Sequence, residues 1–348
     1  MDTVVTPTAE TTATEPKTAD PKAAAPATAD PTTVDPATVD PATVDPTTVD
    51  PATVDPDTVD TDTADPSAEA GAGVAAAVVH HYTSDRLIER IKAALRATGV
   101  APGTTTPADL KPVDAFHTGG TAATEALLDL LDLQPHTRVL DIGCGIGGTL
   151  RQILARAPCP AAGVDLTPAY VEAAEELSRI TGLTPSRGFH VADARDLPYE
   201  DGAFDLVTML HVGMNIADKA AMFREAGRVL ERGGRFALYD LMAGPTAGAI
   251  DFPMPWAGHA ALSFVAPPQT YRAAAAEAGL VLEHERDRSA FGVAFFEKAL
   301  RAIETNGLAP LGIHLLIGED EARTKLGNLH AAIAAGRLQP TEMIFEKP

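Results

Sequence analysis

Residues 139–149 read Val-Leu-Asp-Ile-Gly-Cys-Gly-Ile-Gly-Gly-Thr. An apolar run that ends at Asp141 leads directly into a loop with several glycines. Gly143 can adopt a positive φ, Gly145 lets the backbone approach a ligand closely, and Gly148 lets the following helix pack closely on the strand. This stretch therefore predicts a strand, a tight loop and a helix that together hold a nucleotide-like ligand.

A second acidic residue supports this prediction. Asp165 ends the apolar run at residues 161–164 and lies 165 − 141 = 24 residues after Asp141. A Rossmann-like sheet places the carboxylate that binds a ribose at about this separation. No Gly-Lys-Ser/Thr follows the glycines, which excludes a phosphate-binding P-loop.

The chain of 348 residues divides into two parts of different composition. Residues 1–78 contain no Phe, Tyr or Trp, and the unit Asp-Pro-x-Thr-Val occurs six times between Asp30 and Val59. A proline in every unit removes a backbone donor and favours extended geometry at the preceding residue, so neither a helix nor a paired strand fits. We expect residues 1–74 to form a disordered acidic tail and residues 75–348 to form the folded domain.

Charge and hydropathy limit the partners of the chain. The formal net charge is −21, of which 2 − 15 = −13 comes from residues 1–78. Nucleic-acid binding needs clustered Lys and Arg, which this balance does not favour. No apolar run approaches the roughly 20 residues that cross a bilayer, and the N-terminus lacks the apolar core of a signal peptide. We expect a cytoplasmic protein that binds neither nucleic acid nor membrane, with a homodimer as one possible assembly.

Beyond residue 75, short apolar runs alternate with segments of helical periodicity. This alternation predicts a Rossmann-like α/β fold, in which helices cover both faces of a mostly parallel sheet. Residues 241–268 and 290–337 fall outside the alternation and are expected to form lid segments over the carboxyl edge of the sheet. The expected strands are residues 137–142, 161–165, 188–192, 204–210, 234–240, 280–286 and 341–345. The expected helices are residues 75–98, 121–131, 148–157, 168–181, 217–231 and 269–278, with a Pro/Thr-rich connector at 99–112.

Several motifs together resemble the motif series of class I S-adenosylmethionine-dependent methyltransferases. They are Asp141-Ile142-Gly143-Cys144-Gly145, Asp165, Val191-Ala192-Asp193-Ala194, Phe204-Asp205-Leu206-Val207 and Arg228-Val229-Leu230-Glu231-Arg232-Gly233-Gly234-Arg235. The resemblance covers residues 80–348 and implies a seven-stranded sheet whose last strand is antiparallel. It also implies S-adenosylmethionine as the cofactor, and no metal is expected.

The resemblance implies how these residues would hold the cofactor. Gly143 and Gly145 would pass close to its methionine part, and Asp141 would support the loop and the amino group. Asp165 would accept hydrogen bonds from both ribose hydroxyls, and Asp193 would accept one from the adenine amino group. The Ala194 backbone N–H would meet the adenine ring. The residues expected to bind the cofactor are Asp141, Gly143, Gly145, Asp165, Leu166, Asp193, Ala194 and His211.

Two other interpretations of these residues stay open. A nicotinamide dehydrogenase shares the glycine fingerprint and the downstream acid. The acid two residues before Gly143 and the Leu-Glu-Arg-Gly-Gly turn at residues 230–234 favour methyl transfer over hydride transfer. The second alternative is a protein with the methyltransferase fold but no activity, whose acidic tail docks on a basic partner.

Residues 116–120, 211–216 and 253–257 resemble a bacterial subgroup described as sarcosine/dimethylglycine methyltransferase-like, or type 11 methyltransferases. This resemblance implies a small-molecule acceptor methylated at an amine nitrogen, with O- or C-methylation of a phenolic, quinone-like or natural-product substrate as the alternative. An amine needs proximity and a neutral nucleophile. A phenol or carbon acceptor needs a base, and His211 is the candidate because its ordinary pKa lies near working pH.

The same segments supply the expected acceptor site. His211 is the expected catalytic residue, with a structural histidine beneath the lid as the alternative. Trp256 is expected to form one wall of a cation-binding site or to be a core residue of the lid. The residues expected to bind the acceptor are Tyr82, His117, Asn215 and Trp256.

Overall fold

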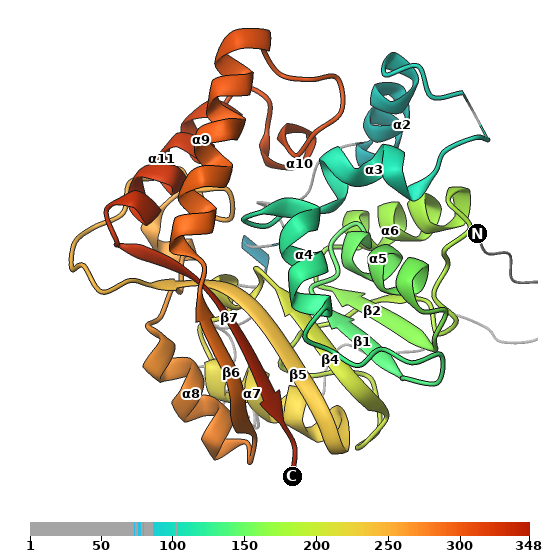
Figure 1. Ribbon diagram of the computed structural model, residues 1–348, viewed down its shortest axis with the longest axis vertical. Helices are drawn as coiled ribbons and strands as arrows, with labels where there is room; N and C mark the ends of the chain where they lie inside the picture. Colours follow the sequence, from blue (N-terminus) through green and yellow to red (C-terminus); the bar gives the residue numbers. More distant parts are fainter. Residues whose placement is uncertain (1–72, 74–75, 78, 80–85, 102) are drawn as a thin grey trace, which may run out of the picture. The chain divides into compact units, whose positions relative to one another are not determined.

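The computed structural model describes residues 73, 76, 77, 79, 86–101 and 103–348, which are drawn in colour in Figure 1. Its centre is a seven-stranded sheet with the strand order β3-β2-β1-β4-β5-β7-β6. Neighbouring strands are parallel except at β7, which is antiparallel to both β5 and β6. This topology confirms the predicted Rossmann-like sheet with an antiparallel last strand. The strands are β1 (Val139–Ile142), β2 (Ala161–Asp165), β3 (Phe189–Val191), β4 (Phe204–Leu210), β5 (Leu230–Ala243), β6 (Val281–Asp287) and β7 (Leu338–Glu346).

Helices cover both faces of the sheet, as predicted. On one face, α7 (Lys219–Val229) and α8 (Pro268–Glu277) share a buried apolar cluster with Leu140 and Ile142 of β1. On the other face, Val139 of β1 belongs to a cluster with α4, α5 and α6. Successive residues of a strand point to opposite faces, so β1 contributes to both clusters and is buried along its whole length. The three helices of the second face are α4 (Gly120–Leu128), α5 (Gly148–Arg156) and α6 (Pro168–Ile180).

The segments expected to form a lid lie at one end of the sheet. Residues 290–337, expected as one helical stretch, form α9 (Ser289–Asn306), α10 (His314–Ile317) and α11 (Ala322–Ala334). These helices gather with α2 (Leu87–Ala97) and α3 (Pro107–Asp114) above the strands in the view of Figure 1. A third buried apolar cluster joins side chains of these five helices with Trp256 from the other expected lid segment. Whether the two segments act as a lid stays a prediction.

Helix α3 lies in the Pro/Thr-rich connector, for which no helix is predicted from the sequence. Pro107 is in its first turn, and the Thr106 backbone N–H donates to Asp109 Oδ2 at 2.8 Å. Thr followed three positions later by an acid, with Pro at the first helical position, is a helix-start pattern. The sequence therefore carried a signal for α3 that the Pro/Thr composition of the connector concealed.

A buried ion pair fixes α3 against α5. Arg151 Nη2 lies 2.5 Å from Asp114 Oδ1, and the two side chains are only 1% and 6% exposed. A Cβ on Gly148 would lie 2.0 Å from the Asp114 backbone oxygen. Gly148 therefore allows α5 to approach the end of α3, which corrects the expectation that it allows close packing on the strand.

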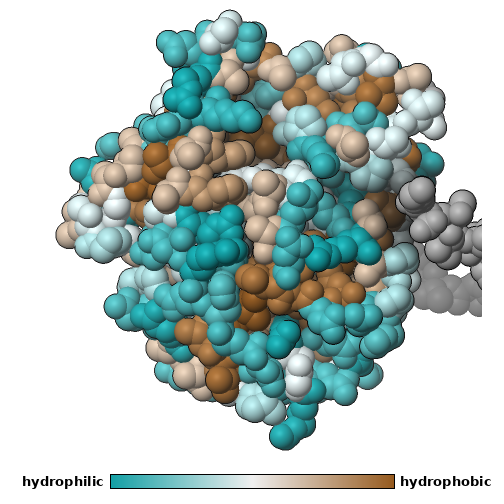
Figure 2. Space-filling model, in the orientation of Figure 1, coloured by the Kyte–Doolittle hydropathy of each residue, from teal (hydrophilic) through white to brown (hydrophobic). Residues whose placement is uncertain are grey.

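The expected disordered tail lies outside the described residues, apart from residue 73. Within the described part of the chain, no helix is both long and apolar enough to cross a membrane. Figure 2 shows a face on which polar residues dominate and apolar residues appear in limited patches.

Candidate active site

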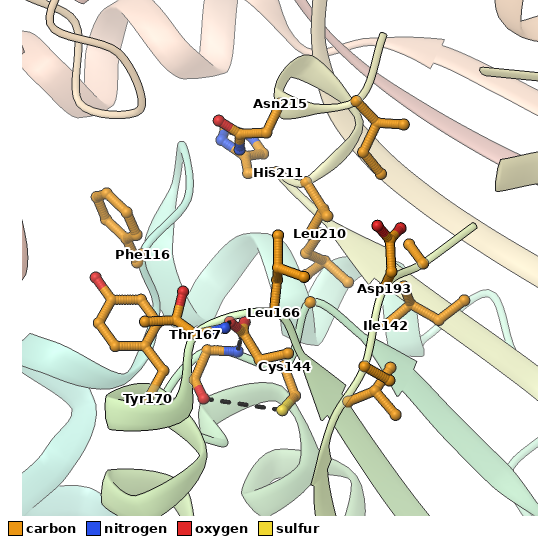
Figure 3. Close-up of a pocket in the computed structure, with 18 of the residues that line it drawn as sticks. Phe116, Ile142, Cys144, Leu166, Thr167, Tyr170, Asp193, Leu210, His211 and Asn215 are labelled. Atoms are coloured by element: carbon orange, nitrogen blue, oxygen red, sulfur yellow. Dashed lines mark hydrogen bonds between the residues drawn. The ribbon is translucent and has the colours of Figure 1, made fainter. Parts of the chain in front are cut away.

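A cavity of about 530 Å³ lies at the carboxyl ends of β1, β2, β3 and β4 (Figure 3). Its size is within the range of small-molecule and cofactor pockets. Asp141 does not line it but lies in the strand beneath, with 2% of its surface exposed. The expected cofactor-binding residues that line this first cavity are Gly143, Gly145, Asp165, Leu166, Asp193, Ala194 and His211.

The loop after β1 has the conformation that its glycines predict. Gly143 has a φ of 68°, and a Cβ there would lie 2.2 Å from Val212 Cγ2. Gly145 has a φ of 54°, and the space that its Cβ would occupy is open. The buried Cys144 thiol contacts the Gly145 carbonyl at 3.8 Å (dashed line in Figure 3), and burial raises the pKa of Cys144 well above its usual value. A ligand can therefore approach the backbone at Gly145, whereas Cys144 is not an activated thiol.

Asp165 connects the end of β2 to this loop. Its Oδ2 accepts a hydrogen bond from the Gly145 N–H at 2.9 Å, and its Oδ1 accepts one from the Thr167 N–H at 2.8 Å. Burial raises the pKa of Asp165, while the bonds from Thr167 and Gly145 act in the opposite direction. A carboxylate offers about four acceptor positions, so capacity for further donors remains. Its contact with the ribose hydroxyls stays a prediction.

Asp141 supports the loop from within the sheet. It lies opposite Thr208 in the pairing of β1 with β4, and the Thr208 hydroxyl donates to Asp141 Oδ1 at 2.7 Å. Burial raises the pKa of Asp141 to about 7, although the bond from Thr208 lowers it. Its contact with the amino group of the cofactor stays a prediction.

Asp193 follows β3 and is paired within the chain. Arg195 Nη2 donates to Asp193 Oδ2 at 2.6 Å, and the Arg195 backbone N–H donates to Oδ1 at 2.8 Å. Burial alone would raise the pKa of Asp193, but the hydrogen bonds from Arg195 lower it overall. Arg195 was not among the expected site residues, although its position two residues after Asp193 was a usable signal. A bond from the adenine amino group to Asp193 would share the carboxylate with this arginine.

His211 follows β4 in a left-handed conformation, with a φ of 56°. Its backbone N–H donates to the Tyr239 carbonyl at 2.7 Å, and its ring centroid lies 5.0 Å from that of Tyr239 and 5.9 Å from that of His117. Burial lowers the pKa of His211 well below its usual value, and the neighbouring His117 lowers it further. Burial also lowers the pKa of His117 to about 4. Both imidazoles are therefore neutral near pH 7.

The two histidines lie between the first cavity and a second one. The second cavity has a volume of about 510 Å³ and shares Phe116, His117 and His211 with the first. Its remaining wall comes largely from the helices gathered above the sheet, including α9 and α11. Figure 3 shows Phe116 and Tyr170 on one side of the first cavity, Asp193 on the other, and His211 beside Asn215.

The expected acceptor-binding residues are distributed between the two cavities. His117 lines both, and Asn215 lines the first. Trp256 lines the second, is 2% exposed, and donates from its indole N–H to Ser263 Oγ at 3.1 Å. Tyr82 lies outside the described residues. Trp256 therefore belongs to the core under the helices as well as to the cavity wall.

Sequence reasoning missed several residues that the fold brings to these cavities. Tyr170 lines the first and His314 the second. Thr124 of α4 places its hydroxyl 2.9 Å from His117 Nε2. No local pattern marks these residues, because each comes from a different helix. Among the described residues, no group of three His, Cys, Asp or Glu side chains is placed to hold a metal ion.

Known proteins are similar to the part of this chain that supplies most residues of the first cavity. A family model described as a methyltransferase domain matches residues 140–238. Tocopherol O-methyltransferase from Arabidopsis thaliana is 39% identical over 101 residues, which are 29% of this chain and 29% of that protein. A 27-O-demethylrifamycin SV methyltransferase from Amycolatopsis mediterranei (strain S699) is 30% identical over 186 residues, 53% of this chain and 68% of that protein. The chain spans less than half the length of several other curated relatives that it matches.

The fold also has solved counterparts. A candidate sarcosine dimethylglycine methyltransferase from Galdieria sulphuraria superimposes with a TM-score of 0.53 at 22% identity, covering 65% of this chain and 85% of that one. The relative from Amycolatopsis is a methyltransferase, and the chain covers 68% of its length. The glycine loop and the carboxylates at the strand ends are the residues that the methyltransferase motifs predict at this site. The chain belongs to the S-adenosylmethionine-dependent methyltransferase family.

Proposed function

We propose that this chain transfers a methyl group from S-adenosylmethionine, bound in the first cavity, to a small-molecule acceptor bound in the second. One observation carries the proposal: the two cavities share Phe116, His117 and His211. Molecules in the two cavities would therefore approach one another at these side chains. Such proximity is the main requirement of an in-line methyl transfer.

The donor groups of the first cavity fit this cofactor. The open space at Gly145 admits a ligand against the backbone, and Asp165 and Asp193 supply acceptors for hydroxyl and amino groups. Ala194 lies beside Asp193 in the lining, where its backbone can meet an adenine ring. S-adenosylmethionine supplies an electrophilic methyl group on a sulfonium sulfur when it is bound.

The residues of the chain would then position the reactants and exclude water. Phe116 and the apolar side chains of α9 and α11 surround the second cavity with few polar groups. His211 lies at the junction, where it can orient the acceptor or take its proton. Its neutral state near pH 7 is the one that a proton acceptor requires.

The methyl group could be transferred to a nitrogen, an oxygen or a carbon of the acceptor. The sequence favours an amine nitrogen of a sarcosine- or dimethylglycine-like molecule, with a hydroxyl or a carbon as the alternative. The relatives include one named for O-methylation of tocopherol and a fold neighbour named for sarcosine and dimethylglycine. These names support a small-molecule acceptor and do not distinguish nitrogen from oxygen.

The proposal is tested first by binding. Gly145 and Gly182 both have positive φ values and open space at the Cβ position, but only Gly145 lines the first cavity. We expect isothermal titration to show S-adenosylhomocysteine binding to the wild type and to Gly182→Ala, with clear weakening in Gly145→Ala. A screen of amines, phenols and quinone-like compounds with labelled methyl donor then identifies acceptors. No binding of S-adenosylhomocysteine to the folded wild-type protein would refute the proposal.

A further inference from the structure

The second cavity has an unusual balance of charge. No Asp or Glu is present among the described residues that line it, and its titratable lining residues are Lys111, His117, His211 and His314. The Lys111 side chain is 57% exposed, and its Nζ lies 3.8 Å from Glu125 Oε1, so this cation is at the solvent rim. The titratable groups of the interior are therefore three imidazoles, and the buried Thr118 hydroxyl adds an uncharged polar group.

These imidazoles are neutral at pH 7. Burial lowers the pKa of His117 to about 4, lowers that of His211 well below its usual value, and also lowers that of His314. The cavity interior consequently offers a counter-ion neither to a buried ammonium nor to a buried carboxylate or phosphate. Burying a charge without a partner is strongly unfavourable. An uncharged ligand is the one that this lining accommodates.

The two histidines at the junction differ in their hydrogen bonding. His117 Nε2 lies 3.1 Å from the Gly120 carbonyl and 2.9 Å from Thr124 Oγ1. A carbonyl can only accept, so the tautomer that satisfies this contact carries its proton on Nε2 of His117. His211 Nε2 is buried and has no hydrogen-bond partner among the described residues. Nε2 of His211 is therefore a buried ring nitrogen left for a ligand, and it accepts a hydrogen bond in the tautomer that carries the proton on Nδ1.

We infer that the acceptor is an uncharged, predominantly apolar molecule that fills the second cavity and presents a hydroxyl group to His211 Nε2. This inference rests on the proposed function, because it names the substrate class of the same site. The apolar part of the acceptor would contact side chains such as Phe296 of α9 and Leu329 of α11. An amine as small as sarcosine would leave most of a cavity of about 510 Å³ unfilled.

The reaction balances with these groups alone. The hydroxyl oxygen forms a bond to the methyl carbon while the carbon–sulfur bond breaks, and its electron pair stays on sulfur. The O–H proton passes to His211 Nε2, so the positive charge lost from the sulfonium appears on the imidazole. Solvent then removes this proton. No oxidant, reductant or metal takes part in the step.

An aliphatic amine fits the site less well. Such an amine is protonated near neutral pH, like a lysine side chain with its pKa of about 10.4, and must lose this proton before it can attack. In the second cavity, the ammonium form would face a sulfonium without any carboxylate among the described lining residues. The hydroxyl compound arrives neutral and avoids this cost.

The test uses the full chain saturated with S-adenosylhomocysteine and four naphthalene probes of similar size. These probes are 2-naphthol, 2-naphthylmethylamine, 2-naphthoate and naphthalene, titrated by calorimetry at pH 7.5. We expect 2-naphthol to bind at least about tenfold more tightly than either charged probe, a difference of about 1.4 kcal/mol. Equal or tighter binding of a charged probe, or no binding of 2-naphthol, would overturn the inference while leaving the binding of S-adenosylhomocysteine, and thus the proposed function, intact.

Variants locate the probe within the cavity. Ala299 lines the second cavity on α9, whereas Ala294 of the same helix is exposed and does not line it. We expect Ala299→Trp to weaken 2-naphthol binding at least about tenfold without changing the affinity for S-adenosylhomocysteine, and Ala294→Trp to change neither. The retained affinity for S-adenosylhomocysteine shows that the Ala299→Trp variant is folded. Unchanged 2-naphthol binding in Ala299→Trp would place the acceptor elsewhere.

The hydroxyl contact has its own test. In the wild type, 2-naphthol should bind more tightly than naphthalene, because only 2-naphthol can donate to His211 Nε2. In His211→Phe this difference should disappear, while naphthalene binding and the melting temperature stay close to those of the wild type. A preference for 2-naphthol that persists in His211→Phe would show that the hydroxyl group lies at another residue.

Discussion

Replacement of Asp165 by alanine tests the first cavity most directly. The Asp165 carboxylate already accepts the Gly145 N–H at 2.9 Å and the Thr167 N–H at 2.8 Å, so it fixes the glycine loop before any ligand binds. We expect the same carboxylate to accept the two ribose hydroxyls of the cofactor. Its removal would leave both hydroxyl donors without their acceptor in a partly buried site.

The size of the effect follows from these contacts. Hydrogen bonds to a charged group contribute about 1.5–3 kcal/mol each, and the two share one carboxylate, so we expect a loss of about 2–4 kcal/mol. This corresponds to about 30- to 1000-fold weaker binding of S-adenosylhomocysteine. The effect on stability should be smaller. Burial raises the pKa of Asp165, so the substitution removes an unfavourable buried charge as well as the hydrogen bonds from Gly145 and Thr167.

Two further variants separate charge from position. Asp165→Asn keeps the size of the side chain, but its amide NH₂ cannot accept an N–H donor, so we expect an intermediate loss of affinity. Glu172→Ala removes an exposed negative charge from α6, which follows the same strand, and should leave the affinity unchanged. Isothermal titration with S-adenosylhomocysteine measures all three variants. If Asp165→Ala stays folded and binds as tightly as the wild type, the assignment of Asp165 to the ribose is wrong.

Three further predictions concern single residues of the site. Burial raises the pKa of Asp141 from 3.8 to about 7, so the ligand-free protein binds a proton there more tightly when folded, and its free energy of unfolding should fall as pH rises from about 4 to about 7. Urea unfolding should show a smaller fall in Asp141→Asn, and equal slopes in both proteins would contradict the role of this carboxyl. Gly143→Ala places a Cβ 2.2 Å from Val212 Cγ2 at a φ of 68°, so urea unfolding should show at least about 2 kcal/mol more destabilisation than in Gly182→Ala, where only the left-handed conformation costs about 1–2 kcal/mol. A Gly143→Ala variant as stable as Gly182→Ala would show that the loop can move away from Val212. With a hydroxyl acceptor, His211→Ala should lower turnover by about 10²–10⁴-fold with little change in the affinity for S-adenosylhomocysteine. With an amine that arrives neutral, steady-state kinetics should instead show mainly a raised acceptor KM, and wild-type kinetics would make His211 structural.

The sequence predicted the sheet and many residues of the first cavity, because both depend on local patterns. A buried parallel strand appears in the sequence as a short run of apolar residues, and all seven expected strands are present. The glycines after β1 and the acids at the ends of β1 and β2 are adjacent to their strands, so their position follows from the strand itself. The right-handed crossover then brings the carboxyl ends of these strands to one edge. Helix α3 was missed although its start pattern is local, because the proline-rich connector around it resembled a loop.

The shape and charge of the second cavity could not be predicted from local sequence patterns. Nε2 of His211 has no hydrogen-bond partner within the part of the chain that the structure describes. This nitrogen and the cavity between α9, α11 and the sheet lie where segments distant in the chain meet. The sequence marked His117, His211 and Trp256 as candidates, and their resemblance to an amine methyltransferase subgroup favoured nitrogen. The absence of carboxylates from the described lining of the second cavity depends on which faces of α9, α10 and α11 turn inward. Periodicity along one helix shows that it has an apolar face, but only packing against the other helices determines what that face encloses. The sequence therefore specified the fold and predicted residues that line the first cavity, while the charge and size of the second cavity came from the tertiary packing of the helices over the sheet.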